Sequence, residues 1–183
     1  MKSKIIIVLI LLSVIAFAGC TSYQNNTTGN KSSISLTSSA FSDNGMMPVK
    51  YTANGENVSP PLSWSSAPAN TKSFAVLCQD PDSSSGDFTH WIIFNIPANT
   101  TQLNESVPQQ GTLSNGAKQG TNDFGKIGYS GPNPPSGVHR YVFTVYALDV
   151  ELNLNTGANK NDFLNAIKGH VLAQGTLTGK YGK

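Results

Sequence analysis

Apolar residues along this chain follow the two patterns that predict β-strands. In some segments they alternate with polar residues, which is typical of a strand with one buried face. In others they form a short unbroken run, which is typical of a strand buried on both faces. Clusters of glycine, proline, asparagine and aspartate separate these segments and predict turns. The predicted extended segments are 34–41, 47–51, 60–64, 73–79, 91–96, 141–148 and 171–178.

Two details of the pattern indicate how these strands pack. The segment 73–79 is apolar almost throughout and predicts a central strand, and Leu62 and Trp64 are two residues apart and should face the same side. Many short strands separated by such turns favour an all-β fold, specifically a β-sandwich.

The exception to the strand pattern is a short helix near the C-terminus, predicted over Asn161–Gly169. Lys160 or Asn161 is expected at its N-cap, and Gly169 is a natural stop. Its predicted apolar face consists of Phe163, Leu164 and Ile167.

Residues 1–19 predict a signal peptide rather than part of the fold. Lys2 and Lys4 precede an apolar run of about 14 residues, which is short for a membrane-spanning helix of roughly 20. Small residues then precede Cys20, as in a lipoprotein signal, and this predicts that Cys20 becomes the lipidated first residue of an exported protein. Plain cleavage to a secreted protein and an uncleaved anchor are the alternatives.

The polar segment 20–33 has no apolar periodicity and predicts a flexible tether, which leaves one folded domain over residues 34–183. A lipid on Cys20 would hold this domain on the outer face of the cell membrane or elsewhere in the envelope.

Net charge and cysteine content narrow the function further. Twelve Lys and Arg residues oppose ten Asp and Glu residues, and removal of Lys2 and Lys4 leaves ten of each. A neutral domain without a cluster of basic residues lacks the positively charged surface that nucleic-acid binding requires. The two cysteines can form a disulfide only if Cys20 is not acylated, and Cys78 lies in an apolar run that predicts burial.

Two short segments carry the candidate chemistry, and each places a proline-stiffened turn ahead of a histidine. The first is Asp80-Pro81-Asp82 followed by His90-Trp91, and the second is Gly131–Pro135 followed by His139-Arg140-Tyr141. Proline fixes its own backbone and keeps the preceding residue extended. If the two turns meet in space, they form a small rigid pocket with two imidazoles, a carboxylate, a phenol and backbone N–H groups.

This set of groups suits a phosphate-sized anion. Gly131 lets a ligand oxygen approach the backbone, and Tyr141 adds a hydroxyl donor. Because a protonated imidazole donates to an anion, affinity should rise as the pH falls through about 6.5. Strand alternation puts Arg140 on the opposite side, so we expect it to pair with Asp123 or Asp82. We also expect Asp82 to bond the backbone of the serine-rich loop that follows it.

Several motifs of this chain resemble those of a known protein family. Five motifs occur in order: Ser59-Pro60-Pro61-Leu62-Ser63-Trp64, Asp80-Pro81-Asp82, His90-Trp91, Asn122-Asp123-Phe124-Gly125 and the run from Gly128 to Tyr141. Together they resemble the phosphatidylethanolamine-binding protein family, in its prokaryotic Raf-kinase-inhibitor-like branch. The resemblance covers roughly Ile34 to Lys183.

The resemblance implies an antiparallel β-sandwich with Greek-key connections and an anion pocket at one end of the sheets. Carried over residue by residue, the ligand-binding positions are Asp80, His90, Gly131, His139 and Tyr141, and the pocket walls are Pro81, Trp91 and Pro132. It further implies a phosphate-bearing ligand such as a phospholipid head group, with a protease or kinase as a possible protein partner and with no cofactor.

One departure from the family pattern concerns the loop after the first turn. Many relatives carry a proline and an arginine where this chain has Ser83-Ser84-Ser85-Gly86-Asp87, which puts the partner in doubt more than the pocket. An exported protein meets no cytosolic kinase, so that role is not transferred. The sequence does not determine the oligomeric state, and a dimer is one of the alternatives.

Non-catalytic binding is the favoured function, and three alternatives stay open. Two histidines, an aspartate and a tyrosine can perform acid–base or phosphoryl chemistry, although no nucleophile motif accompanies them. His90, His139 and Asp80 are a sufficient ligand set for zinc. The long polar loop 104–135 can act as the surface of an envelope protease inhibitor. His170 is expected to be structural.

Overall fold

The computed structural model describes residues 32–65 and 67–182. The predicted signal peptide, Cys20 and most of the predicted tether lie outside these residues. Within the described part of the chain, no helix has the length and apolar character needed to cross a membrane.

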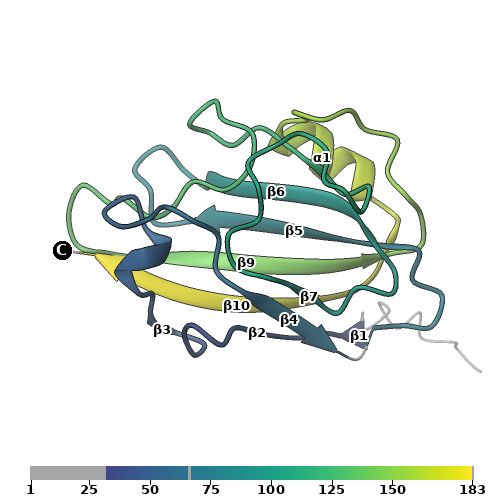
Figure 1. Cartoon of the computed structure of the whole chain (residues 1–183), viewed down its shortest axis with the longest axis horizontal. Helices are drawn as coiled ribbons and strands as arrows, with labels where there is room; N and C mark the ends of the chain where they lie inside the picture. The colour runs from purple at the N-terminus through teal and green to yellow at the C-terminus, as the bar shows by residue number, and fades with distance from the viewer. Residues whose placement is uncertain (1–31, 66, 183) are drawn as a thin grey trace, which may run out of the picture. The chain divides into compact units, whose positions relative to one another are not determined.

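The strands form two sheets (Figure 1). The large sheet contains β1 (Ser32–Ser33), β3 (Gly45–Met46), β5 (Ser73–Asp80), β6 (Phe88–Pro97), β8 (Lys118–Gln119), β9 (Val138–Leu148) and β10 (Val171–Gly182), and the small sheet contains β2 (Ser35–Thr37), β4 (Leu62–Ser65) and β7 (Gln102–Leu103). The large sheet runs in the order β1-β10-β9-β5-β6-β8, and β3 also pairs with β10. β1 and β3 pair with β10 in parallel, and the other pairings of these strands are antiparallel.

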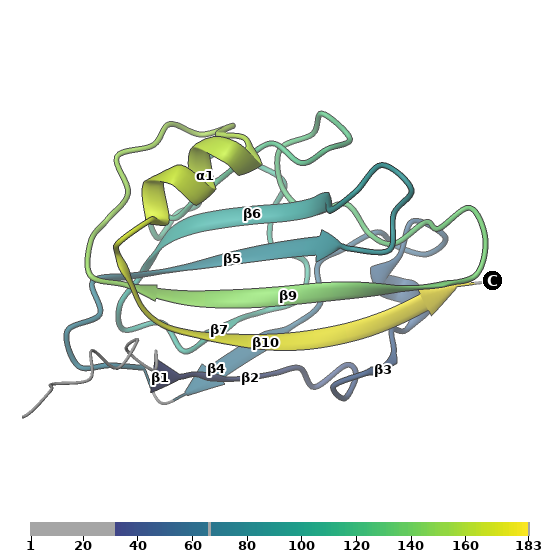
Figure 2. The same ribbon diagram turned by 180° about the vertical axis from the view of Figure 1, so that it is seen from behind.

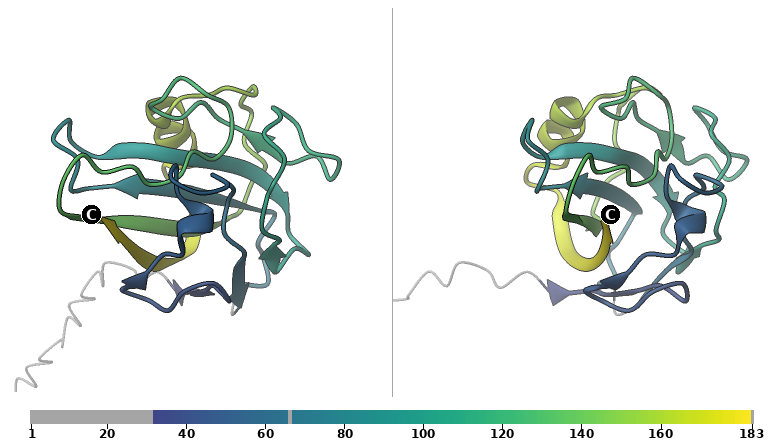
Figure 3. Two further views of the ribbon diagram at one scale, coloured as in Figure 1. Left: turned by 60° about the vertical axis from the view of Figure 1, so that its left-hand side comes forward. Right: turned by 90° about the vertical axis from the view of Figure 1, so that its left-hand side faces the viewer.

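The strand β5 is buried on both faces, which confirms the prediction of a central strand at 73–79. Phe74, Val76 and Cys78 belong to the core that includes Leu62 and Trp64 of the small sheet. The alternate residues of β5 belong to a second apolar layer on the opposite face of the large sheet, beneath the helix α1 (Lys160–Ile167) (Figures 2 and 3). The chain therefore needs apolar residues at successive positions of β5, and this explains its unbroken run.

The helix α1 begins one residue earlier than predicted. Its N-cap is Asn159, whose side-chain oxygen accepts a hydrogen bond from the backbone N–H of Asp162 at 3.0 Å. Phe163 and Ile167 are buried under the helix as expected, but Leu164 is 38% exposed and does not belong to the apolar face.

The prediction of an extended segment over 47–51 is wrong, because these residues contain a 3₁₀ turn, η1 (Val49–Tyr51). The backbone N–H of Tyr51 donates to the carbonyl of Pro48, and that of Thr52 donates to the carbonyl of Val49. The Thr52 hydroxyl also donates to the Val49 carbonyl at 2.8 Å. Local i→i+3 bonding thus replaces a strand ladder.

The strands β6 and β9 each begin three residues before the predicted positions. His90 and His139 therefore lie inside strands, and not ahead of them as the sequence suggested. The ladder fixes this, since Thr89 pairs with Gln79, and His139 pairs with Tyr181. Both histidines are consequently held by backbone hydrogen bonds on rigid elements.

The connection from β6 to β9 is long, and it returns the chain so that β9 pairs with β5 rather than with β6. Its fixed point is Gln119 in β8. The Gln119 amide accepts from the indole N–H of Trp91 at 2.7 Å and donates to the carbonyls of Pro108 and Gln110. The predicted polar loop 104–135 is thus tied to the core at its middle.

Candidate functional site

A pocket of about 180 Å³ opens at the end of the large sheet where β5, β6 and β9 meet. Antiparallel pairing brings the end of β5 beside the beginnings of the other two strands. Its lining residues are Asp80, Ser83, Ser84, Phe88, His90, Phe124, Asn133, Pro134, Pro135, His139 and Tyr141. A larger hollow of about 400 Å³ lies along residues 104–115, but no histidine or aspartate lines it. The smaller pocket is therefore the candidate site for the predicted chemistry.

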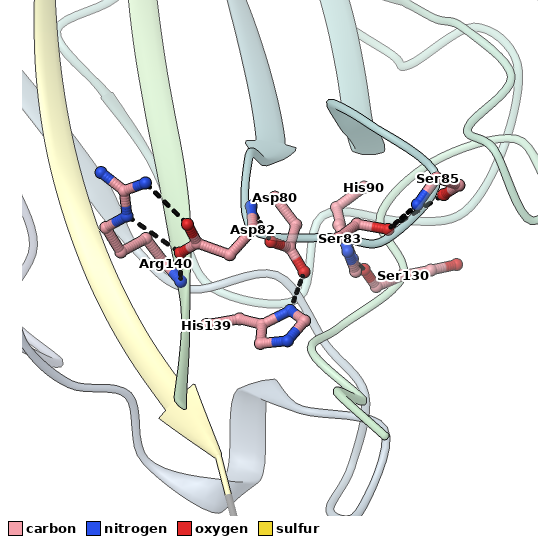
Figure 4. A network of polar contacts seen from close by, with 8 residues as sticks. All are labelled: Asp80, Asp82, Ser83, Ser85, His90, Ser130, His139 and Arg140. Atoms are coloured by element: carbon pink, nitrogen blue, oxygen red, sulfur yellow. Dashed lines mark hydrogen bonds and ion pairs between the residues drawn. The ribbon is translucent and has the colours of Figure 1, made fainter. Parts of the chain in front are cut away.

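Asp80 and His139 form the polar centre of this pocket (Figure 4). Asp80 is the last residue of β5 and is buried, and one of its carboxylate oxygens accepts from Nδ1 of His139 at 2.7 Å. The other oxygen accepts from the backbone N–H of Asp82 at 2.8 Å. Both oxygens of the buried carboxylate are thus paired, and the His139 ring is oriented by it.

His90 contributes the second imidazole. Its Nδ1 lies 2.6 Å from the carbonyl oxygen of Ser130, and the backbone N–H of Ser130 donates to the carbonyl of His90. Burial lowers the pKa of His90, because the apolar surroundings disfavour the charged ring. The Ser130 carbonyl and the carboxylates of Asp80 and Asp123 oppose that shift. Burial therefore favours the neutral form of His90, which can still form hydrogen bonds.

Tyr141 also lines the pocket. Its ring meets that of His90 edge-on, with centroids 5.1 Å apart. Burial, followed by the negative charge of Asp80, raises the pKa of Tyr141 well above its usual value. The hydroxyl stays protonated at any physiological pH and can act as a donor, and a side-chain hydrogen bond with Asp80 contributes to the same shift.

A second acid–base pair lies beside the pocket and does not line it. The Arg140 guanidinium donates to both carboxylate oxygens of Asp82, at 2.6 and 2.9 Å. This pairing lowers the pKa of Asp82 to about 2. The expected pairing of Arg140 with Asp82 is confirmed. The expected bond from Asp82 to the serine loop is wrong, since Asp80 makes the local turn bond.

Four predicted site residues fall outside the pocket lining, and Gly131 is the most informative. Its N–H donates to the side-chain oxygen of Asn57 at 2.7 Å, so it does not face a ligand. A Cβ at this position would lie 2.5 Å from the carbonyl oxygen of Tyr51. Glycine is needed here for close backbone packing. Trp91 points into the core between the sheets, and Pro81 and Pro132 are not among the residues that line the pocket.

Sequence reasoning missed the aromatic wall of the pocket. Phe88 and Phe124 contact each other edge-on at 4.8 Å, and both contact the ring of His90 at 5.4 Å. Phe88 pairs directly with Asp80 in the ladder between β5 and β6, which places it beside the pocket. Sequence alternation could not show this, because a register shift between Cys78 and Gln79 interrupts the ladder at His90. Phe124 lies in the turn motif Asn122-Asp123-Phe124-Gly125, where no strand alternation indicates its direction. Its position depends on the turn that Asn122 caps by accepting from its backbone N–H.

The zinc alternative receives no support from this geometry. In the described residues, no group of three or more histidine, cysteine, aspartate or glutamate side chains is arranged to hold a metal ion. Nδ1 of each pocket histidine is already bonded to a protein oxygen.

The burial of His90 predicts a pH effect on stability. The unfolded chain binds a proton on this ring as the pH falls below about 6.5, whereas the folded chain resists it, so the free energy of unfolding should decrease. We expect this decrease to be smaller in His90→Asn, measured by thermal unfolding between pH 5 and pH 8. His170→Asn is the control, because His170 is exposed and pairs with Asp149. An unchanged pH profile in His90→Asn would contradict the assignment.

Comparisons with known proteins bear on this architecture. The family model described as phosphatidylethanolamine-binding protein matches residues 37–182. A UPF0098 protein of Methanothermobacter thermautotrophicus is 53% identical over 148 residues, which cover 81% of this chain and 98% of that protein. A UPF0098 protein of Pyrococcus horikoshii is 44% identical over 186 residues, which cover 99% of this chain and 90% of that protein.

Two solved structures share the fold. Escherichia coli YbcL, described as a member of the mammalian PEBP family, superposes with a TM-score of 0.78 at 32% identity, covering 83% of this chain and 99% of its own. A phosphatidylethanolamine-binding protein homologue from Chlamydia trachomatis superposes with a TM-score of 0.76 at 39% identity, covering 82% and 98%.

Proposed function

This chain belongs to the phosphatidylethanolamine-binding protein family, and from that premise we propose that its pocket binds a phosphate-bearing ligand without transforming it. The observation that carries the proposal is the convergence of Asp80, His90, His139 and Tyr141 on one small pocket from three strands. Hydrogen-bonding groups fixed on rigid strands and facing a small concave space are what recognition of a compact anion requires.

The same geometry favours binding over hydrolysis. Among residues 32–65 and 67–182, no serine, threonine or cysteine side chain is hydrogen-bonded to either pocket imidazole. The Ser83 hydroxyl, which lines the pocket, pairs with the Ser85 hydroxyl at 2.9 Å. An activated nucleophile needs a base within hydrogen-bond reach, and these serines lack one.

Phosphate binding can be tested by isothermal titration of inorganic phosphate at pH 6. We expect Tyr141→Phe and His139→Gln each to weaken binding by about tenfold or more, because each removes a polar group that faces the ligand. His170→Gln is the matched control, since His170 forms a similar histidine–aspartate pair with Asp149 outside the pocket. It should bind phosphate like the unmodified protein.

Two results would count against this function. One is the absence of heat from phosphate, phosphoethanolamine and acetate alike in the folded protein. The other is equal weakening by the pocket variants and by His170→Gln, because that pattern would place the anion elsewhere.

Export and membrane attachment are proposed from the sequence pattern around Cys20. A diacylglyceryl group on Cys20 would hold the domain at a membrane surface. The mass of the N-terminal peptide from cells measures this modification, and an unmodified Cys20 in the mature chain would contradict it. A protease or kinase partner stays a prediction of the family resemblance.

A further inference from the structure

We propose that the pocket selects a phosphate monoester that still carries a proton, and that it discriminates against phosphate diesters and sulfate. This inference rests on the proposed function and adds the ester class of the ligand. It follows from the hydrogen-bonding role that the fold imposes on His90.

The role of each His90 nitrogen is set by Ser130. A carbonyl oxygen can only accept a hydrogen bond, so Nδ1 of His90, 2.6 Å from the Ser130 oxygen, must carry the hydrogen. In a neutral imidazole the other nitrogen, Nε2, then has a lone pair and no hydrogen. Nε2 is an acceptor.

The surroundings of His90 keep the ring neutral. The rings of Phe88, Phe124 and Tyr141 contact it edge-on, and the side chain is 3% exposed. The charged or titratable groups that act on His90 are Asp80 and Asp123, and His139 shares the pocket. Desolvation outweighs the two carboxylates, and the pKa of His90 is lowered.

Nε2 of His90 is open to the pocket. It makes no hydrogen bond to any described residue. The buried side-chain nitrogen and oxygen atoms without a partner in this part of the chain are Trp64 Nε1 and Thr89 Oγ1. Nε2 is therefore not sealed in the interior, and the space that His90 borders is the pocket. A ligand atom seated there meets a fixed acceptor.

The charged groups of the pocket also favour a ligand that carries a proton. No lysine or arginine is among its lining residues, and the nearby Arg140 is engaged by Asp82. Asp80 contributes a buried carboxylate. An anion without a proton would thus place its oxygens against a carboxylate and an acceptor nitrogen. No hydrogen bond can form between these groups, so binding would be weakened.

A protonated phosphate monoester satisfies both sides of this pocket. Its P–OH donates to Nε2 of His90, and its other oxygens can accept from the Tyr141 hydroxyl, which lines the same pocket. A phosphate diester has no P–OH, and sulfate carries no proton at neutral pH. Either would leave Nε2 of His90 unpaired beside an oxygen.

The test compares three probes of similar size: methyl phosphate, dimethyl phosphate and sulfate, titrated at pH 5.5 and pH 8. At pH 5.5 methyl phosphate retains one proton, since its second pKa is about 6. We expect it to bind about tenfold or more tightly than the other two at that pH. The preference over dimethyl phosphate should shrink at pH 8, where the monoester has lost its proton.

His90→Asn is the informative variant, because the asparagine amide can turn either an oxygen or an NH₂ group toward the ligand. The preference for methyl over dimethyl phosphate at pH 5.5 should fall toward unity. Should this variant fail to fold, ¹⁵N spectra of the imidazoles in the unmodified protein supply the second measurement. They should show Nδ1 of His90 protonated and Nε2 unprotonated, with the Nε2 resonance shifting when methyl phosphate is added.

The outcomes separate this inference from the function on which it rests. If none of the three probes binds, the proposed anion function fails, and the discrimination fails with it. If methyl and dimethyl phosphate bind equally at pH 5.5, or if Nε2 of His90 is protonated, the discrimination alone is overturned. Phosphoethanolamine and a phosphoserine peptide both carry the required group, so both should exceed dimethyl phosphate, and the tighter of them identifies the source of the monoester.

Discussion

Replacement of Phe163 by alanine should lower the free energy of unfolding by about 3–5 kcal/mol. Phe163 is completely buried and packs against the rings of Phe94 and Tyr146, with centroids 6.4 and 6.0 Å away. Truncation loses this burial and leaves a cavity between α1 and the large sheet. Urea unfolding followed by circular dichroism measures the change.

Leu164→Ala is the matched control for this prediction, because it removes a side chain of similar character from the next position of the same helix. Leu164 is 38% exposed, and leucine and alanine have similar helix propensities. We expect a change below about 1 kcal/mol. Equal destabilisation by the two variants would mean that helix formation, and not packing on the sheet, accounts for the loss.

Replacement of Gly131 by alanine should destabilise the protein by about 1–3 kcal/mol. The added methyl group would lie 2.5 Å from the carbonyl oxygen of Tyr51 and 2.8 Å from Cα of Thr52. Both are backbone atoms of a segment held by local hydrogen bonds, so they cannot give way as a side chain would. A decrease in melting temperature of about 2–4 °C per kcal/mol is expected for a domain of this size.

Ser136→Ala serves as the control, since Ser136 is exposed and belongs to the same connection before β9. Its free energy of unfolding should differ by less than about 0.5 kcal/mol from that of the unmodified protein, so the melting temperature should be nearly the same. A Gly131→Ala protein as stable as this control would show that the backbones at residues 51 and 131 are farther apart than the structure places them.

The strands were predictable because their apolar patterns are local. The alternation at Leu62 and Trp64 and the unbroken run of β5 report directly which faces are buried. The 3₁₀ turn at Val49–Tyr51 was not predictable in this way, because it depends on capping by Pro48 and Thr52 rather than on periodicity. The early starts of β6 and β9 depend on their ladder partners, which a strand's own composition does not reveal.

The candidate site was predictable to the extent that its groups lie at strand ends beside proline turns. Asp80, His90, His139 and Tyr141 were expected in one pocket, and the structure brings them together. Gly131 does not present its N–H to a ligand, because this group donates to Asn57, 74 positions earlier in the chain, and the backbone of Tyr51 packs against it. Only a three-dimensional arrangement shows that crowding.

The hydrogen-bonding role of His90 was likewise beyond the sequence. It is set by the Ser130 carbonyl, 40 residues away on the long connection. The expectation that affinity for an anion rises as the pH falls through about 6.5 stays a prediction, to which His90 contributes less because burial lowers its pKa. Burial disfavours the charged form of His90. We infer that the lone pair on its Nε2 selects the ligand instead.

The strand β10 joins the two ends of the domain. Its residue Ala173 pairs with Ser32, where the described chain begins, and its residue Tyr181 pairs with His139 at the pocket. Eight residues of extended chain separate these points by roughly 27 Å. A biosensor surface coupled ahead of Ser32 therefore leaves the pocket directed at the bulk solution, whereas a fusion partner placed after Gly182 sits beside its entrance.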